Sequence, residues 1–524
     1  MQSYAQWSTD PSNNLIVGYG LLPELASDGA GGCYITYEQN LGYPRRLVLE
    51  RLNRYGYKVW SQPVRIRGEL PEQWFAKITE DGRGGVLISY SDDSIAQIGG
   101  IGRIRVQRVD SSGNVLWGST GVRISLSETN QDRQAIVADG RGGCIVAWVD
   151  EDRDLRINRI DSTGTRVWRD SGKYVWNSAE RPPMTSDGKG GCYTVFGIGR
   201  LQHFGQNGNM HWPISGVTVP TGARIIKTDG SAYVYLFGGK YLGFENGQQV
   251  FTLNHQKVDT TGTLLWDSLG VTIDTLRTNS FILMDFALQN CYSMLTWPQN
   301  TGNGVWDLRT QIVRNDGSTV FEYGGIPLRS IVSMKSIAGL IPSDSATAVF
   351  VWTDNRTPPG IYAQRLDTSG LAQWDTNDIA LCLISLGGLK LTSDANGGCI
   401  LVGWRETDFT VRAQQVSKYG NLGEVITAVD DATNRVPYEF FLYQNYPNPV
   451  NPTTTIQFDI PHQSWVKLDV FNVLGEHLRN IVDEVRAPGT YQATFDASGI
   501  PNGVYWYRLQ TENSFFVRKL TVLK

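Results

Sequence analysis

The sequence predicts an all-β protein with two parts: an eight-bladed β-propeller, alternatively a seven-bladed one, followed by a small Ig-like β-sandwich. Three features predict the propeller: a recurring Gly-x-x-x-Trp element, a recurring Asp-Gly-x-Gly-Gly element, and short stretches in which apolar and polar residues alternate. We expect residues 1–427 to form about eight four-stranded repeats, with the ring closed by the N-terminal strand. Residues 428–438 have linker character, and residues 439–524 are expected to form the sandwich.

The Gly-x-x-x-Trp element defines the repeats. It occurs at Gly56–Trp60, Gly113–Trp117, Gly164–Trp168, Gly208–Trp212, Gly262–Trp266 and Gly370–Trp374, and after Gly317 the aromatic residue is Phe321. Together with Gly420, these glycines recur at a mean spacing of about 52 residues, which is typical of propeller blades.

The two ends of the repeat region complement each other. No tryptophan follows Gly420, whereas Ala5-Gln6-Trp7 near the N-terminus repeats the order of Ala372-Gln373-Trp374. We therefore expect the last blade to combine three strands, from residues near Leu391 to Lys418, with an outer strand from the first dozen residues. Such closure leaves no long exposed sheet edge.

The Asp-Gly-x-Gly-Gly element predicts tight turns, because glycine adopts the positive φ angles that such turns require. Near-copies and variants begin at Asp28, Asp81, Asp139, Asp187, Asp229 and Asp394. Each joins two apolar stretches, and the strand that follows alternates with a period of two, as in residues 155–158. The sixth repeat has residues 287–290 in place of this turn, which leaves open a count of seven blades plus an irregular domain.

Charge and hydropathy exclude two classes of protein. The net charge is −4, without the basic stripe typical of nucleic-acid binding. No apolar run approaches the ~20 residues that cross a bilayer, so we expect no transmembrane segment. Met1 leads directly into an expected strand, so we expect either a cytoplasmic protein or a mature chain from which the signal peptide was removed.

The cysteines predict buried thiols rather than disulfides. Four of them follow the Gly-Gly turn, at the place that Val86 takes in the second repeat: Cys33, Cys144, Cys192 and Cys399. Equivalent positions in different blades are too far apart for a disulfide. No CxxC pair supports a zinc site.

Motifs of a known family follow the linker. They are Asn445-Tyr446-Pro447-Asn448-Pro449, Phe471-Asn472-Val473-Leu474-Gly475, Gly503-Val504-Tyr505 and the stretch from Lys519 to Lys524. In order and spacing the segment resembles the type A C-terminal sorting domain of cargo exported by the type IX secretion system of Bacteroidetes and related bacteria. The resemblance covers residues 439–524 and does not extend to the propeller.

The resemblance implies a destination and a partner. It implies passage through the inner membrane by a separate signal peptide, then export by the type IX secretion machinery to the cell surface or the extracellular space. The residues expected to carry the sorting signal are Asn445, Pro447, Asn448, Pro449, Gly475, Gly503, Tyr505, Lys519 and Lys524.

The strand order predicts a binding surface. The Asp-Gly-x-Gly-Gly turns are expected to join strands one and two, and the Asp-Ser-x-Gly turns, such as residues 161–164, to join strands three and four, so both fall on one face of the ring. The opposite face carries the longer, variable loops, where function tends to reside. An aromatic-x-acid element recurs on this variable face, and carboxylates beside aromatic rings suit sugars or calcium. The candidate ligand-binding residues are Asp92, Trp148, Asp150, Asp154, Trp352, Asp354, Arg356, Trp404 and Glu406.

A purely architectural interpretation competes with this one. Repeated residues usually maintain a repeat, so the aromatic residues would pack between blades while the acids pair with Arg153 or Arg356. Ion pairs are also expected within blades, between residues two apart on one strand face. These pairs are Arg108 with Asp110, Arg159 with Asp161, and Arg365 with Asp367.

The sequence favours binding over catalysis. The five histidines lack metal-binding spacing, and there is no GxSxG elbow or phosphate loop. No cofactor is evident, and calcium is the one that the acidic elements could take. We expect a binding or scaffold propeller whose ligand is a glycan or a surface protein. The alternatives are a carbohydrate-active hydrolase or lyase that uses propeller carboxylates, and a structural component of a surface layer or filament.

Overall fold

The protein is all-β. The computed structural model describes residues 7–39, 45–67, 72–93, 102–178, 180–197, 199–219, 222–230, 232–279, 283–289, 292–300, 305–329, 333–344, 346–374, 377–423, 440–445, 447–460, 463–487, 489–511 and 515–523. No helix occurs among these residues. The chain divides into two compact units, Met1–Glu424 and Val425–Lys524. The expected linker, 428–438, lies outside the described residues.

The described part of the first unit forms eight four-stranded antiparallel sheets. The first sheet contains β2 (Leu21–Ser27), β3 (Cys33–Gln39), β4 (Arg46–Leu52) and β5 (Val64–Arg65), and the second contains β6 (Glu72–Glu80), β7 (Val86–Asp93), β8 (Gly102–Val109) and β9 (Val122–Arg123). The third contains β10 (Gln131–Ala138), β11 (Cys144–Asp150), β12 (Asp154–Ile160) and β13 (Lys173–Asn177), and the fourth contains β14 (Met184–Ser186), β15 (Cys192–Phe196), β16 (Arg200–Phe204) and β17 (Val217–Thr218). The fifth sheet contains β18 (Ala223–Thr228), β19 (Tyr233–Glu245), β20 (Gln248–Asp259) and β21 (Val271–Thr278), and the sixth contains β22 (Asp285–Gln289), β23 (Tyr292–Asn300), β24 (Trp306–Arg314) and β25 (Ile326–Pro327). The seventh contains β26 (Lys335–Pro342), β27 (Thr347–Asp354), β28 (Gly360–Asp367) and β29 (Ile379–Cys382), and the last contains β30 (Gly387–Ser393), β31 (Cys399–Arg405), β32 (Thr410–Val416) and β1 (Leu15–Tyr19).

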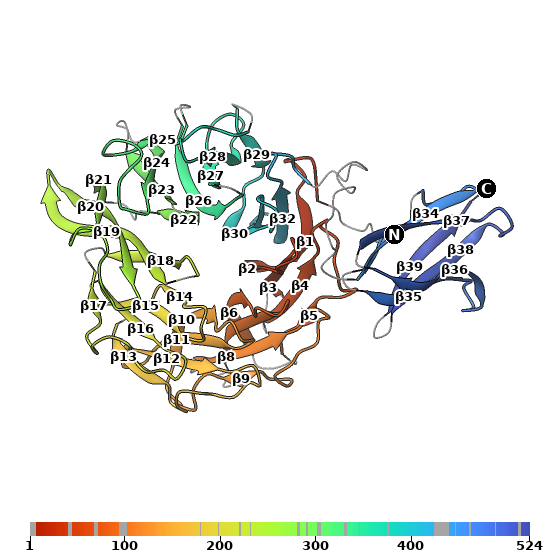
Figure 1. Cartoon of the computed structure of the whole chain (residues 1–524), viewed down its shortest axis with the longest axis horizontal. Helices are drawn as coiled ribbons and strands as arrows, with labels where there is room; N and C mark the ends of the chain where they lie inside the picture. Colours follow the sequence, from red (N-terminus) through yellow and green to blue (C-terminus); the bar gives the residue numbers. More distant parts are fainter. Residues whose placement is uncertain are drawn as a thin grey trace. The chain divides into compact units, whose positions relative to one another are not determined.

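These sheets have a propeller-like arrangement around a common centre (Figure 1). The strands nearest the centre are β2, β6, β10, β14, β18, β22, β26 and β30. Each of them contacts the next in this order, and β30 contacts β2, so the series has no free end. The prediction of an all-β, propeller-like unit is therefore confirmed.

Each repeat tryptophan packs against the repeat glycine of the following sheet. The ring of Trp117 lies against Gly164, and its Nε1 donates a hydrogen bond to the Ser162 carbonyl at 3.2 Å. A glycine is required there because its φ is +86° and a Cβ would approach the ring to 3.2 Å. The same contact recurs at Trp60–Gly113, Trp168–Gly208, Trp212–Gly262, Trp266–Gly317, Phe321–Gly370 and Trp374–Gly420.

Trp7 supplies the eighth contact of this series. It lies against Gly56, and its Nε1 donates to the Arg54 carbonyl at 2.8 Å. The N-terminal segment therefore takes the place of the tryptophan that does not follow Gly420.

The outer strand of the last sheet begins later than expected. β1 pairs with β32, with Leu15 opposite Ala413, so the strand lies after the first dozen residues and not within them. The reason is that the tryptophan precedes the outer strand instead of lying in it, as Trp168 precedes β13, which begins at Lys173.

The Asp-Gly-x-Gly-Gly turns are organised by their aspartates. Asp139 Oδ1 accepts hydrogen bonds from the backbone N–H groups of Arg141 and Gly143, both at 2.8 Å. Its Oδ2 accepts from Arg159 Nη2 at 2.7 Å. The predicted partner of Arg159 was wrong: Asp161 instead accepts backbone N–H groups within its own turn, while the arginine reaches the aspartate two strands away.

The same exchange of partners occurs in two other sheets. Arg108 pairs with Asp81 at 2.7 Å, and Arg365 pairs with Asp344. Asp110 and Asp367 instead accept backbone N–H groups within their turns.

The cysteines have the environment that the sequence predicts. Cys33, Cys144, Cys192, Cys382 and Cys399 are free and buried, and these are all the cysteines of the described ranges. Burial raises the pKa of the Cys382 thiol to about 11. Such a thiol is protonated and unreactive at neutral pH.

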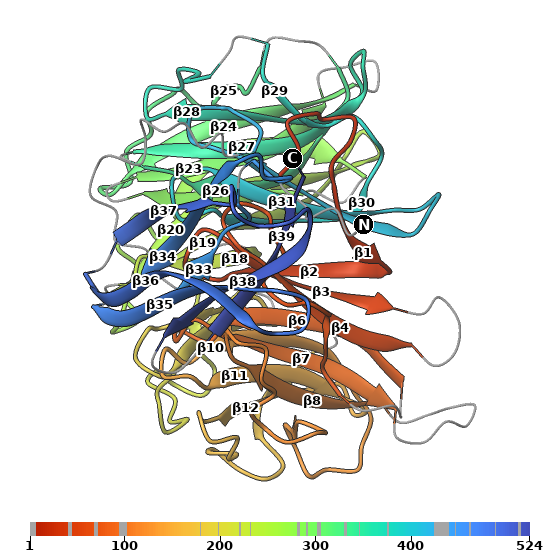
Figure 2. The ribbon, with the colours of Figure 1, turned by 90° about the vertical axis from the view of Figure 1, so that its right-hand side faces the viewer.

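The second unit contains two antiparallel sheets. One is β33 (Phe441–Leu442), β34 (Thr453–Ile460) and β37 (Gly489–Asp496), and the other, visible in Figure 2, is β36 (His477–Arg486), β35 (Ser464–Phe471), β38 (Gly503–Thr511) and β39 (Phe515–Val522). Alternating residues of both sheets, such as Phe458 and Leu468, share one apolar core. The unit is thus built on a core of its own.

Two glycine substitutions test the tryptophan contacts. Gly56 and Gly84 have nearly equal φ angles, +80° and +81°, but a Cβ on Gly56 would lie 2.6 Å from the Trp7 backbone nitrogen, whereas nothing lies within 4 Å at Gly84. Gly84→Ala should cost about 1 kcal/mol, because only backbone strain is added. Gly56→Ala should cost clearly more in urea unfolding, and equal losses would contradict the packing role of this glycine.

Candidate functional site

The aromatic-x-acid elements lie on the second strands of four different sheets. Tyr90 and Asp92 are in β7, Trp148 and Asp150 in β11, and Trp352 and Asp354 in β27, while Trp404 is in β31 and Glu406 follows it. No hydrogen bond or ion pair joins one of these groups to another within the described ranges. Each group is therefore a local cluster.

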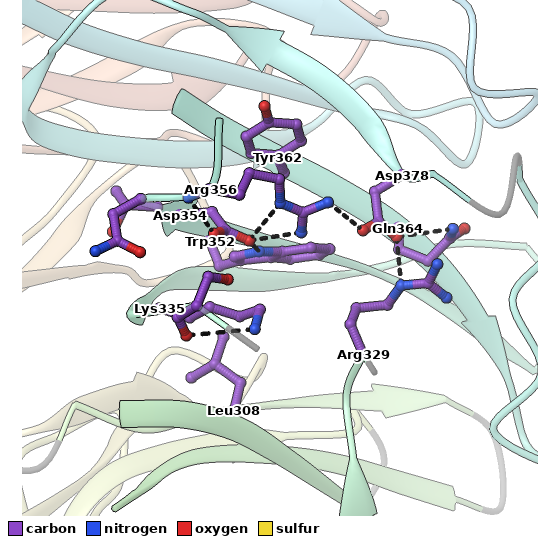
Figure 3. Close-up of polar contacts among 12 residues, drawn as sticks. Leu308, Arg329, Lys335, Trp352, Asp354, Arg356, Tyr362, Gln364 and Asp378 are labelled. Carbon is purple, nitrogen blue, oxygen red and sulfur yellow. Dashed lines mark hydrogen bonds and ion pairs between the residues drawn. The ribbon is translucent and has the colours of Figure 1, made fainter. Parts of the chain in front are cut away.

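The β27 cluster is built around one arginine (Figure 3). Arg356 follows β27, and its Nε donates to Asp354 Oδ2 at 2.7 Å. Trp352 Nε1 donates to the same oxygen at 3.1 Å, and the Arg356 backbone N–H donates to Asp354 Oδ1 at 2.9 Å. The guanidinium lies over the Tyr362 ring, 4.3 Å from its centroid, and the Asp354 side chain has no exposed surface.

A second aspartate completes this cluster. Asp378 precedes β29 and has a left-handed backbone, with φ +65°. One of its oxygens lies 3.0 Å from Arg356 Nη1 and the other lies 2.6 Å from Arg329 Nε and accepts from Gln364 Nε2 at 3.2 Å. Two buried carboxylates and two arginines therefore form one network in which their charges balance.

The acids of β7 and β11 have arginine partners too. Asp92 pairs with Arg67 and Arg105, and its side chain is almost fully buried. Asp150 Oδ2 accepts from Arg156 Nε at 2.5 Å. The partner of Asp150 is thus Arg156 and not the suggested Arg153, whose φ of +63° belongs to the turn after β11.

Asp154 and the fourth element differ from the others. Asp154 is half-buried and lies 3.6 Å from Arg156 Nη2. Glu406 is exposed, and Asp408 instead pairs with Arg405 at 3.1 Å. Hydrogen bonds from Thr410 lower the pKa of Asp408 to about 2.

The aromatic members differ in access to solvent. Trp148, Trp352 and Tyr90 are completely buried, so their rings have no face open to a ligand. Trp148 and Tyr90 lie against Gly172 and Gly121 of their own sheets. Trp404 is the partly exposed member.

Sequence reasoning did not find Asp378, Asp408 or the arginines of Asp92. Asp378 lies in a loop without strand alternation, and Asp408 is two residues beyond the position that the repeat indicates. The offset is visible in the sequence only once Thr410 is known to begin β32.

The titration of Asp354 gives a test of this cluster. Burial raises the pKa of Asp354, but hydrogen bonds from Arg356 and Trp352 lower it by more than burial raises it. The pKa of Asp354 therefore lies below its usual value. The ionised form therefore stabilises the fold above the unfolded-state pKa of about 3.9, and this stabilisation is lost as the pH falls through the lower folded-state value.

We expect Asp354→Asn to lower the free energy of unfolding at pH 7 and to lose less stability than the unaltered chain on acidification. Urea unfolding at pH 7 and pH 3 measures both. Asp152→Asn, at an exposed acid, is the matched control. A difference between Asp354→Asn and the unaltered chain that stays constant with pH would contradict the ion pair.

No metal site emerges from the described side chains: no group of three or more His, Cys, Asp or Glu residues among them could hold an ion. Calcium binding also requires free carboxylate oxygens. One oxygen of each of Asp92, Asp150 and Asp354, Oδ2, is engaged by an arginine.

The expected sorting residues have two kinds of environment. Asn445 is buried, and its Nδ2 donates to Thr454 Oγ1 at 2.9 Å. Asn448 Oδ1 accepts the Thr521 N–H at 3.0 Å, which joins this segment to β39. Tyr505 is buried, with its hydroxyl on the Pro501 carbonyl at 2.9 Å.

The remaining sorting residues mark turns and an exposed strand. Gly475 has φ +81° in the turn after β35, and Gly503 begins β38. Pro447 accepts a hydrogen bond from Thr454 at 2.8 Å, and Pro449 follows Asn448. The Lys519 side chain is exposed, and Lys524 lies outside the described residues.

Residues 444–523 match the model of the secretion system C-terminal sorting domain. The second unit carries a C-terminal sorting domain. This match confirms the resemblance drawn from the sequence motifs, and it implies export to the cell surface or the extracellular space. No described helix is long and apolar enough to cross a membrane.

Several solved structures are similar to parts of this chain. Chaetomium thermophilum Sqt1, bound to the N-terminus of the ribosomal protein L10, is 12% identical over 76% of this chain and 99% of its own, with a TM-score of 0.40. PorZ, a surface component of the type IX secretion system of Porphyromonas gingivalis, is 8% identical over 98% of this chain and 100% of its own, with a TM-score of 0.18. A putative exo-β-1,3-galactanase of Bifidobacterium bifidum is 10% identical over 51% of this chain and 98% of its own, with a TM-score of 0.27. No curated protein matches the sequence. Because the TM-scores of these three structures are all low, the similarities carry no argument about function.

Proposed function

We propose that the chain is exported by the type IX secretion system and that its propeller-like unit is a non-catalytic binding or scaffold module. The match of residues 444–523 to the sorting domain carries the export proposal. We also propose the finer architecture: eight blades within residues 1–427 closed by the N-terminal strand, a linker at 428–438, and an Ig-like sandwich at 439–524.

The arginine-paired acids support binding over catalysis. General acid–base catalysis and glycoside hydrolysis need carboxyl groups that exchange protons or attack substrate. Asp92, Asp150 and Asp354 are instead fixed by arginines, and proton uptake would break those pairs. In the proposal these residues shape the loops of the variable face, and Trp404 and Glu406 are the members that contact ligand.

The sorting domain is tested by deletion. The full chain, produced with a signal peptide in a bacterium that has type IX secretion, should reach the medium or the cell surface. A chain ending at residue 424 should accumulate in the periplasm. Equal export of both chains would refute the sorting role.

The binding module is tested with the full chain on a glycan and polysaccharide array, with calcium and again with chelator. Selective binding supports a glycan ligand, and its loss in chelator adds a metal to the site. A silent array, together with a monomer in sedimentation velocity, would refute both glycan binding and a self-assembling scaffold, and would leave a protein ligand.

A further inference from the structure

Three charged residues converge from neighbouring inner strands. Glu24 of β2 forms ion pairs with Lys77 of β6 and with Lys390 of β30, the latter at 3.1 Å, and both lysines approach the same oxygen, Oε1. The strands β30, β2 and β6 are consecutive around the centre (Figure 1). Two ammonium groups thus share one carboxylate.

These charges do not belong to the repeat. Each residue stands four positions before the turn aspartate of its sheet, at Asp28, Asp81 and Asp394. The equivalent positions in four other sheets are uncharged: Ala135, Pro183, Ile225 and Leu340. Repeated residues usually maintain a repeat, so an architectural role does not explain a cluster confined to three sheets.

The cluster has an excess of positive charge. Burial lowers the pKa of Lys77, and the nearby positive charges of Lys390 and the exposed Arg181 lower it as well. Glu24 raises it, but the pKa of Lys77 still lies below its ordinary value. A second ion pair between inner strands, Lys227 with Asp285 at 2.9 Å, is balanced one to one. The excess therefore belongs to the Glu24 cluster.

Solvent reaches the charges. The exposed fractions of the side chains are 23% for Lys77, 36% for Lys390 and 15% for Glu24. Partly buried cations in low dielectric bind an anion more strongly than fully solvated ones do. Lysine also binds carboxylate and sulfate as a point charge, without the fixed fork of arginine.

We propose that Lys77 and Lys390 form an anion-binding site at the centre of the propeller-like unit, which takes the carboxylate or sulfate group of an acidic glycan. The inference rests on the proposed glycan-binding function and names the class of glycan. Glu24 holds the two lysines in position and competes with the ligand anion for them.

The test is isothermal titration of the full chain with oligogalacturonides, with neutral galacto-oligosaccharides of the same length, and with sodium sulfate. Lys77→Gln/Lys390→Gln should weaken oligogalacturonide binding at least about tenfold, because both cations are lost. Glu24→Gln should strengthen it, because the competing carboxylate is removed. A merely structural role predicts weaker binding in both variants, so the opposite signs are decisive.

Controls separate this site from general charge effects. Lys189→Gln/Lys240→Gln removes two exposed lysines and should leave the affinity unchanged. Melting temperatures identify a variant that fails to fold. If a variant fails to fold, competition on the unaltered chain takes the place of that variant as the test, and sulfate should displace the acidic sugar.

The outcomes divide cleanly. Binding of neutral glycans with no effect of these substitutions would overturn the anion site while the glycan-binding function stands. Polyglutamate, a polyanion without sugar, is titrated in the same way, and binding as tight as that of oligogalacturonide would overturn the glycan as ligand class. Absence of binding by every glycan would refute the glycan-binding function itself.

Discussion

Replacing Trp7 by alanine should lower the free energy of unfolding of the first unit by about 3–5 kcal/mol, the range for buried aromatic truncations. Trp7 is 3% exposed, lies against Gly56 and donates to the Arg54 carbonyl at 2.8 Å. The substitution removes one of eight equivalent aromatic contacts between sheets, at the point where the chain's N-terminal segment meets the sheet of β2.

Urea unfolding followed by tryptophan fluorescence and circular dichroism measures the loss. Trp176→Ala is the matched control, because Trp176 is 38% exposed on the outer strand β13 and should cost less. A chain lacking residues 1–12 should have a free energy of unfolding equal to that of Trp7→Ala or lower. Unchanged stability of either variant would mean that the N-terminal segment does not complete the series of contacts.

The repeat could be predicted because its residues are fixed by local geometry. Glycine at positive φ and an aromatic residue four positions later are needed wherever one sheet meets the next, so Gly164 and Trp168 recur with little variation. The same argument predicted the turns after β10 and β14. The sorting motifs could be predicted because they are specific in order and spacing.

The charged contacts could not be predicted from spacing along one strand. Arg159 and Asp161 share a strand face in the sequence pattern, but the guanidinium pairs with Asp139. Asp139 lies in the turn after β10, a strand that is not adjacent in the chain to β12, which carries Arg159. Tertiary proximity decides such pairs. Likewise, Asp378 joins the Arg356 cluster from a loop, and the sequence has no signal for that approach.

The candidate binding residues illustrate the same limit. Their positions at the ends of β7, β11 and β27 followed from the repeat, but their chemistry depends on arginines such as Arg105 and Arg156 that the pattern did not connect to them. The burial of Trp352 also depends on packing that no single repeat contains. Periodicity therefore locates side chains better than it assigns them a role.

Removing one partner of the buried Arg159–Asp139 pair is the second large effect that we expect. The Arg159 side chain is 7% exposed and the Asp139 side chain has no exposed surface, with 2.7 Å between Nη2 and Oδ2. Arg159→Met keeps much of the side-chain length but leaves Asp139 Oδ2 buried without a cation. A buried charge that loses its partner costs about 3–5 kcal/mol.

The chain itself provides the control substitution, because the last sheet replaces the arginine by Gln415, whose Nε2 donates to the turn aspartate Asp394 at 3.0 Å. Arg159→Gln should therefore retain a donor for Asp139 Oδ2 and lose clearly less stability than Arg159→Met in urea unfolding. If the two variants lose the same amount, the hydrogen bond to Oδ2 is not what the arginine contributes. If Arg159→Met loses nothing, the pair has no net effect on stability, and the turn depends on the backbone N–H groups at Asp139 Oδ1 alone.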